Sequence, residues 1–195
     1  MGWVFEGYSQ TYKKFKYSSD KEYFESDIYD KGKNLIQKAL KKSLSGFKVD
    51  EENGAAYIDL EDKGYGKKYL LRGDGTTLYM TQDLYLASLK DEEFKANKYI
   101  FIVASEQKYH FEVLFETLDR LGYGGLDKNY HFAYGMIYDK DGKPFSSRKG
   151  NVIEADELLD IVEQKARENL DNKSPHLSEA EKERRKKIIG YGALS

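Results

Sequence analysis

The sequence predicts an α/β protein, built on part of a Rossmann-like parallel sheet that follows an α+β segment. Three observations support this prediction. After Lys67, short apolar runs alternate with helical patterns, which is the order of a parallel sheet. One of these runs, KYIFIVA, is continuously apolar, as is typical of a strand buried on both faces. Polar loops follow the apolar runs, at the sheet edge where ligands bind in such folds.

The amino-terminal part predicts a mixed layer of helices and one strand. Aromatic residues recur at helical spacing from Trp3 to Phe15. We then expect an extended stretch over 21–29, a helix over 30–46 that Gly46 ends, and an alternating strand over 55–60.

The rest of the chain predicts the parallel sheet. We expect strands near 68–72, 98–104 and 130–137 in one sheet. Thr76 or Thr77 would cap a helix over 77–90, and Ser105 would cap a second helix that ends near Gly122. Two further helices are expected over 154–170 and 178–189. The expected domains are therefore 1–66, an α+β segment, and 67–195, half of a nucleotide-binding fold with trailing helices.

Composition limits the class of protein. The chain has 195 residues, 39% of them hydrophobic, which suffices for one core. Its 32 cations and 34 anions exclude a broadly basic nucleic-acid binder but not a local basic patch. Without Cys there is no disulfide or thiolate metal site, and no run approaches the ~20 apolar residues of a membrane helix. We expect no membrane partner, a cytoplasmic location and no protein-bound metal.

The loop GKPFSSRKGN is the strongest chemical signal. Its hydroxyls and cations, Ser146, Ser147, Arg148 and Lys149, are hydrogen-bond donors that suit a polyphosphate. A solvated basic turn would explain the same residues in isolation. The position after a predicted buried strand favours phosphate binding, although the spacing is not that of a Walker loop.

A second candidate site lies on the helices that follow the first two strands. Tyr79 and Asp83 are four residues apart and share one helix face, where a carboxylate beside a phenol suits a guanidinium. An ordinary helix surface with one core tyrosine is the alternative. Gln107 opens the next helix and would point into the same crevice. His110 is expected to be a packed core histidine rather than a catalytic base.

Four segments together resemble the catalytic domain of arginyl-tRNA synthetase, a class I aminoacyl-tRNA synthetase. They are YLLRGDGTTLYMTQDLYLA, FIVASEQKYHFEVLF, HFAYGMI and GKPFSSRKGNVIEADEL, in the family's order. The upstream segments YFESDIYDKGK and GAAYIDL resemble the family's inserted segment. The resemblance implies activation of arginine with ATP, with Mg²⁺ accompanying the ATP, and transfer of arginine to tRNA(Arg).

The resemblance also implies roles for individual residues. It implies that Asp83, Tyr79 and Glu25 recognise the guanidinium and that Gln107 contacts the backbone end of arginine. Gly135, Met136 and Ile137 match the strand edge that receives adenine. The loop of Ser146, Ser147, Arg148 and Lys149 is similar to the second class I signature, which holds the β- and γ-phosphates. Pro144 and Ser147 stand where that signature has lysines, so Arg148 and Lys149 would supply the charge.

The first class I signature, His-Ile-Gly-His, does not occur in this sequence. We therefore expect a middle fragment of the catalytic domain, inactive alone, whose partner is the first half of that domain. Two alternatives stay open: one half of a split enzyme, or a non-catalytic synthetase-like binding module. An unrelated α/β domain with a basic surface loop is the third.

Overall fold

The computed structural model describes residues 2–135, 138, 142 and 152–194. The chain divides into two compact units, which are described separately. One unit is continuous and comprises 23–137, and the other combines 1–22 with 138–195. The described residues contain no helix that is both long and apolar enough to span a membrane.

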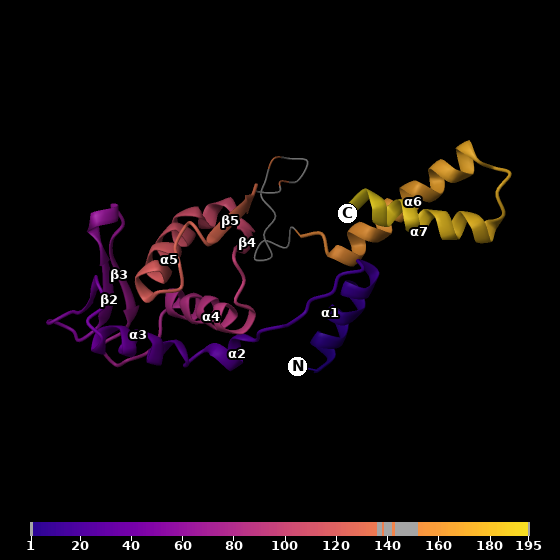
Figure 1. The fold of residues 1–195 in the computed structure, drawn as a ribbon. Helices are drawn as coiled ribbons and strands as arrows, with labels where there is room; N and C mark the ends of the chain where they lie inside the picture. Colours follow the sequence, from indigo (N-terminus) through magenta and orange to yellow (C-terminus); the bar gives the residue numbers. More distant parts are fainter. Residues whose placement is uncertain (1, 136–137, 139–141, 143–151, 195) are drawn as a thin grey trace. The chain divides into compact units, whose positions relative to one another are not determined.

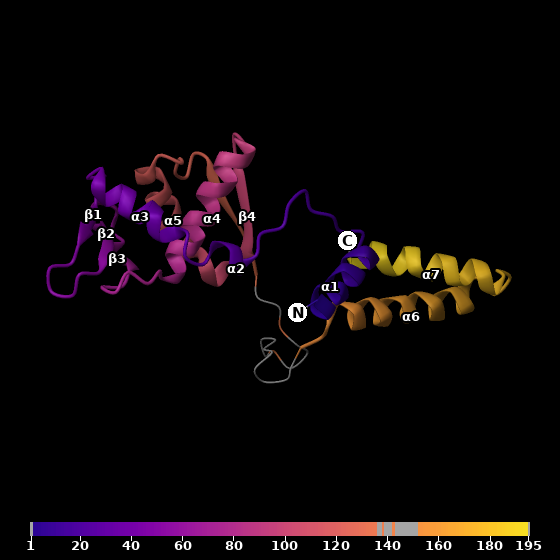
Figure 2. The ribbon, with the colours of Figure 1, turned by 90° about the horizontal axis from the view of Figure 1, so that it is seen from below.

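Among its described residues, the continuous unit contains three longer helices and five strands (Figures 1 and 2). A short helix, α2, begins it. Its helices are α2 (Glu25–Ile28), α3 (Gly32–Lys41), α4 (Tyr79–Phe94) and α5 (Lys108–Leu121). Its strands are β1 (Phe47–Val49), β2 (Ala56–Leu60), β3 (Gly66–Leu71), β4 (Tyr99–Ala104) and β5 (Asn129–Tyr134). Single 3-10 turns occupy η1 (Glu61–Lys63) and η2 (Ser105–Gln107).

The first three strands form an antiparallel sheet in the order β1-β2-β3. Ile58 pairs with Phe47 on one side and Lys68 on the other. The expectation that 68–72 belongs to the parallel sheet is therefore wrong. A short connection through η1 and Gly64, which adopts φ +80°, returns the chain directly to β2, and such tight connections produce antiparallel neighbours.

The parallel sheet consists of β4 and β5, paired from Tyr99↔Asn129 to Ala104↔Tyr134. Phe101 and Val103 lie on the face that packs against the core. Ile100 and Ile102 alternate with them and are 65% and 68% exposed, so the prediction of a strand buried on both faces is wrong within this unit. No described element of the unit covers that second face.

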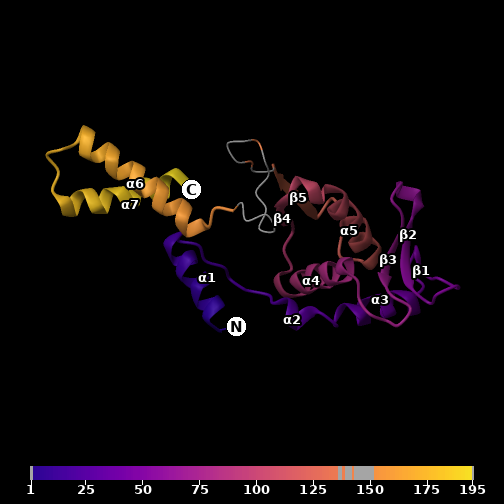
Figure 3. The same cartoon turned by 180° about the vertical axis from the view of Figure 1, so that it is seen from behind.

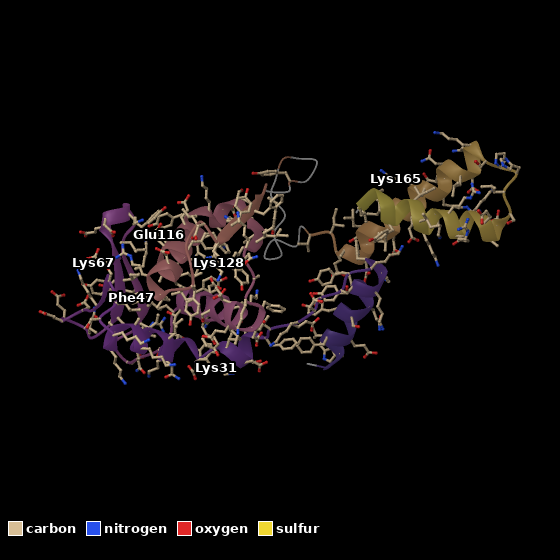
Figure 4. The ribbon with its side chains drawn as sticks, viewed as in Figure 1. Lys31, Phe47, Lys67, Glu116, Lys128 and Lys165 are labelled. Atoms are coloured by element: carbon tan, nitrogen blue, oxygen red, sulfur yellow. The ribbon has the colours of Figure 1, made fainter. Side chains whose placement is uncertain are left out.

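The core of this unit lies between the antiparallel sheet and the helices. Ile36 from α3, Leu84 from α4, Phe115 from α5 and Ile58 from β2 are almost completely buried. Helix α4 contacts both α3 and α5 (Figures 1 and 3). Figure 4 labels Phe47 on β1, which is also buried in this core.

Several local expectations differ from the structure. Helix α5 has Gln107 as its N-cap, and Ser105 begins η2 instead. Helix α3 ends at Lys41 rather than at Gly46.

Part of the expected extended stretch 21–29 forms the single turn α2, whose residue Ile28 is buried. Helix α4 has Leu78 as its N-cap rather than Thr76 or Thr77. The Thr77 hydroxyl instead donates to the carbonyl of Tyr29 at 3.0 Å, which ties the start of α4 to the segment after α2.

The second unit is helical, with α1 (Gly2–Lys14), α6 (Ala155–Lys173) and α7 (Glu179–Leu194). Helices α6 and α7 form an antiparallel hairpin (Figure 2). Its helices are joined by ion pairs, including one between Lys182 and Asp171 at 2.7 Å. Helix α1 contacts α6 through Asp156, which accepts from Thr11 and pairs with Lys14, each at 3.0 Å.

The expected domains, 1–66 and 67–195, stay a prediction. They describe segments of a family fold, whereas the compact units follow contacts within the chain.

Candidate functional site

A cavity of about 220 Å³ lies between α4, α5 and β4. Apolar walls come from Leu86, Phe101 and Leu114. The polar residues that line it are Tyr79, Asp83, Lys90, Gln107 and His110. Small-molecule sites commonly combine such apolar walls with a few polar groups.

A carboxylate, an imidazole and a phenol meet at this cavity. The Oδ2 atom of Asp83 lies 2.7 Å from Nε2 of His110. The Tyr79 ring lies 5.5 Å from the imidazole, centroid to centroid, and the tyrosine is 66% exposed. One turn of α4 separates Tyr79 from Asp83, so both side chains project from the same face of the helix. The site therefore offers an anionic acceptor beside an aromatic ring.

Negative charge dominates around the phenol. The charge of Asp83 raises the pKa of Tyr79, burial raises it further, and the charge of Glu25 adds a smaller effect. Glu25 begins α2, so two carboxylates from different helices act on one hydroxyl. A cationic group in this region would experience both carboxylates.

Lys90 adds a cation to the same cavity. Burial lowers the pKa of Lys90, although the nearby charge of Asp83 opposes that effect. Its ammonium lies 5.4 Å from the Tyr23 ring centroid. The cavity is thus electrostatically asymmetric, with Asp83 and Lys90 separated by two turns of α4.

The structure brings several of the predicted residues together. Tyr79, Asp83 and Gln107 line one cavity, and Glu25 is close enough to affect Tyr79. Their roles as ligands of arginine stay predictions. His110 is partly buried, as expected of a packed histidine, but it also contacts Asp83 directly.

The nucleotide-binding residues are described only in part. Gly135 is exposed and follows β5 directly. Because β4 and β5 are parallel and Ala104 pairs with Tyr134, Gln107 and Gly135 follow strands that end at the same sheet edge. Met136, Ile137, Ser146, Ser147, Arg148 and Lys149 lie outside the described residues.

Lys90 and the bond between Asp83 and His110 were not predicted from the sequence. Lys90 lies seven residues after Asp83, and this helical spacing could have placed it on the same face. His110 is 27 residues from Asp83 on another helix, so no local spacing indicates their contact. Within the described ranges, no group of three or more His, Asp or Glu could hold a metal ion.

Comparison with known families decides the classification. The family model for the catalytic domain of class I tRNA synthetases (R) matches residues 3–195. The chain belongs to this family. The reading as an unrelated α/β domain is therefore wrong, and the predicted α/β fold class and family resemblance are confirmed.

Curated relatives in this family are named arginine–tRNA ligases. The protein of Phocaeicola vulgatus is 40% identical over 194 residues, which cover 98% of this chain and 31% of the relative. The protein of Treponema denticola is also 40% identical, over 100% of this chain and 30% of its own length. The chain therefore spans about a third of the length of these relatives and corresponds to part of a catalytic domain.

Solved structures share the fold. The arginyl-tRNA synthetase of Thermus thermophilus matches with a TM-score of 0.74 at 22% identity, over 95% of this chain and 37% of that protein. The arginyl-tRNA synthetase of Plasmodium falciparum matches with the same TM-score at 14% identity, over 97% of this chain and 31% of that protein. At these identities the likeness concerns the fold alone.

Proposed function

We propose that this chain is part of the catalytic domain of an arginine–tRNA ligase, which activates arginine with ATP and transfers it to tRNA(Arg). Family membership and relatives at 40% identity support the reaction class. The single observation that carries the choice of amino acid is the Asp83, His110 and Tyr79 cluster at the cavity.

Guanidinium recognition follows from the chemistry of this cluster. A carboxylate accepts two parallel hydrogen bonds from a guanidinium fork, whereas a lysine ammonium is a point charge without that fork. The Tyr79 ring offers an aromatic surface beside Asp83 for a planar cation. Glu25 adds a second negative charge near the phenol. Gln107, on the same cavity, would contact the backbone end of arginine.

ATP would bind beyond the carboxyl ends of β4 and β5. We assign adenine to Gly135, Met136 and Ile137, which follow β5 in the sequence, and the β- and γ-phosphates to Ser146, Ser147, Arg148 and Lys149. Charge develops on the leaving pyrophosphate as the arginine carboxylate attacks the α-phosphorus, and cations fixed there lower the barrier. Mg²⁺ would enter with ATP and share this charge. These reactions belong in the cytoplasm, where we place the protein.

The first half of the catalytic domain would complete this site. The exposed face of β4 supports this assignment, because parallel sheets are ordinarily covered on both faces. The alternative is a non-catalytic module that binds arginine or a nucleotide without activating either. The cavity and Asp83 fit that alternative equally well, so an activity assay must separate the two.

The test is aminoacylation by the complete polypeptide that contains this chain. Purified protein is incubated with ATP, Mg²⁺, bulk tRNA and each of the twenty amino acids separately. We expect esterification of arginine alone. Esterification of a different amino acid would contradict the proposed specificity. Arginine binding by calorimetry without any esterification would support the binding module instead.

A further inference from the structure

The carboxylate of Asp83 is held by an imidazole from a neighbouring helix. Nε2 of His110 lies 2.7 Å from Oδ2 of Asp83, and the two side chains are 19% and 26% exposed. A carboxylate only accepts hydrogen bonds, so the proton of this bond lies on Nε2 of His110. This contact gives Asp83 a fixed donor before any ligand arrives.

Aromatic contacts fix the imidazole itself. The His110 ring contacts Tyr79 at 5.5 Å and lies edge-on to Phe111 at 5.6 Å. Phe111 is itself buried in the core, and its ring stacks on that of His131 with a centroid separation of 4.5 Å. The donor therefore sits on a supported ring rather than on a freely rotating side chain.

The bond leaves Asp83 able to accept a ligand. A carboxylate has about four acceptor positions on its two oxygens. Among the described residues, His110 is the hydrogen-bond partner of Oδ2, and Oδ1 has none. Acceptor positions for a forked donor therefore remain, while rotation of the carboxylate about its last bond is restricted by His110.

We propose that His110 is a positioning residue that orients Asp83 for a planar, forked cation. This inference rests on the proposed function and adds to it the residue that sets the carboxylate plane. A point-charge ammonium gains little from a fixed plane, whereas a guanidinium needs both of its bonds aligned at once. His110 thereby contributes to discrimination between arginine and lysine without touching the substrate itself.

The test compares two substitutions in the complete polypeptide. His110→Gln retains a side-chain donor, and His110→Phe retains a ring without a donor. The readouts are KM for arginine and kcat in tRNA-dependent ATP–pyrophosphate exchange, together with the KM ratio of arginine to lysine. We expect His110→Phe to raise KM for arginine about 10-fold with a smaller change in kcat, and His110→Gln to restore most of the loss.

A double-mutant cycle separates positioning from general packing. In an Asp83→Asn background, His110→Phe should have little further effect on KM, because His110 acts through Asp83. His131→Gln is the matched control: His131 also contacts Phe111 but bonds the Val103 carbonyl at 3.0 Å instead of Asp83. This control should lower the thermal midpoint without changing KM for arginine.

The outcomes are distinguishable. An unchanged KM in His110→Phe, equal losses in the Phe and Gln variants, or additive effects in the cycle would each overturn the positioning role. If the unmodified protein does not prefer arginine to lysine, the proposed function itself fails. The thermal midpoints of both His110 variants and of the His131→Gln control show which variants are folded, and only the KM values of folded variants are compared.

Discussion

The Asp83 carboxylate is hydrogen-bonded to His110 and also lines the cavity. In the complete polypeptide, Asp83→Ala should raise KM for arginine and lower kcat/KM by roughly 30- to 1000-fold, on the order of 2–4 kcal/mol. The reason is the loss of a charge-assisted, two-bond acceptor. Steady-state exchange kinetics at varied arginine concentration measure the effect.

The matched control for this prediction is Asp91→Ala. Asp91 lies on the same helix, but it pairs with Lys128 at 2.5 Å and does not line the cavity (Figure 4 labels Lys128). It should leave KM for arginine unchanged. Equal KM values for the two variants would show that Asp83 is not a substrate contact.

Lys90 predicts a pH-dependent effect on stability. Because burial lowers its pKa, Lys90 holds its proton less tightly in the folded chain than in the unfolded chain. The folded state is therefore penalised below the folded pKa and relieved as the pH rises toward the unfolded value of roughly 10.4. Lys90→Met should raise the free energy of unfolding at pH 7, on the order of 1 kcal/mol, and this gain should shrink as the pH rises through the lowered folded pKa of Lys90 toward roughly 10.4.

Urea denaturation followed by circular dichroism measures this effect at several pH values. Lys98→Met provides the control, because Lys98 is an exposed lysine in the connection between α4 and β4. A gain in the Lys98 variant equal to that of Lys90→Met would assign the effect to hydrophobicity rather than to a buried charge.

At the residue scale, local spacing predicted only part of the site. Tyr79 and Asp83 share a face because both lie on one helix, and helical periodicity shows this directly. The contact between Asp83 and His110 joins two helices, so it depends on how α4 and α5 pack. Spacing along the chain holds no information about that packing.

Gly32 marks a close approach between helices α3 and α4. A Cβ atom at this position would lie 2.7 Å from the carbonyl oxygen of Thr81 and 2.8 Å from its Cγ2 atom. Thr81 is fully buried and bonds the Leu70 carbonyl, so it cannot easily yield. Gly32→Ala should lower the free energy of unfolding by about 1–3 kcal/mol.

The comparison variant is Gly7→Ala in α1, where no described atom other than those of the adjoining residues and the helix's own backbone lies within 4 Å of the added Cβ. Alanine in a helix interior is more stable than glycine by roughly 0.5–1 kcal/mol, so this variant should be neutral or stabilising. Thermal unfolding of both proteins decides the matter. A stabilising Gly32→Ala would mean that α3 and α4 separate without cost.

The exposed face of β4 gives a second prediction for an element. Ile102→Lys should change the stability of the 195-residue chain by less than about 0.5 kcal/mol, because Ile102 is 68% exposed there. In the complete polypeptide the same substitution should lower the thermal midpoint, since we assign a covering segment to this face. An equal, small effect in both proteins would contradict that assignment. Val103→Lys, on the opposite face, should destabilise both.

At the element scale, the sequence predicted which segments are strands better than how they pair. The expected strands over 55–60, 68–72 and 98–104 all exist, because their apolar patterns are local. The partner of β3 depends on the connection before it, and the η1 turn makes β2 its antiparallel neighbour. The apolar residues of β4 predicted burial on two faces, but only one face is covered by elements of this unit.

The final prediction concerns the whole molecule. The 195-residue chain alone should show no arginine-dependent ATP–pyrophosphate exchange, even with Mg²⁺ and cognate tRNA. Its sequence has no His-Ile-Gly-His signature, which the resemblance places on the first half of the catalytic domain. The complete polypeptide, assayed in parallel, is the positive control. Exchange by the chain at a rate comparable to that control would contradict its assignment as a fragment.

The order in which the ribosome makes the chain has a consequence for helix α1. Its partners in the same compact unit begin at residue 138, after the entire continuous unit. Asp156, which binds Thr11 and Lys14, emerges about 140 residues after them, or about 7–28 s later at roughly 5–20 residues per second. The unit of 23–137 can therefore finish folding first. During that time the aromatic residues of α1 are in the nascent polypeptide without their partners from α6. Refolding from denaturant imposes no such delay, so the two routes to the native state begin from different intermediates.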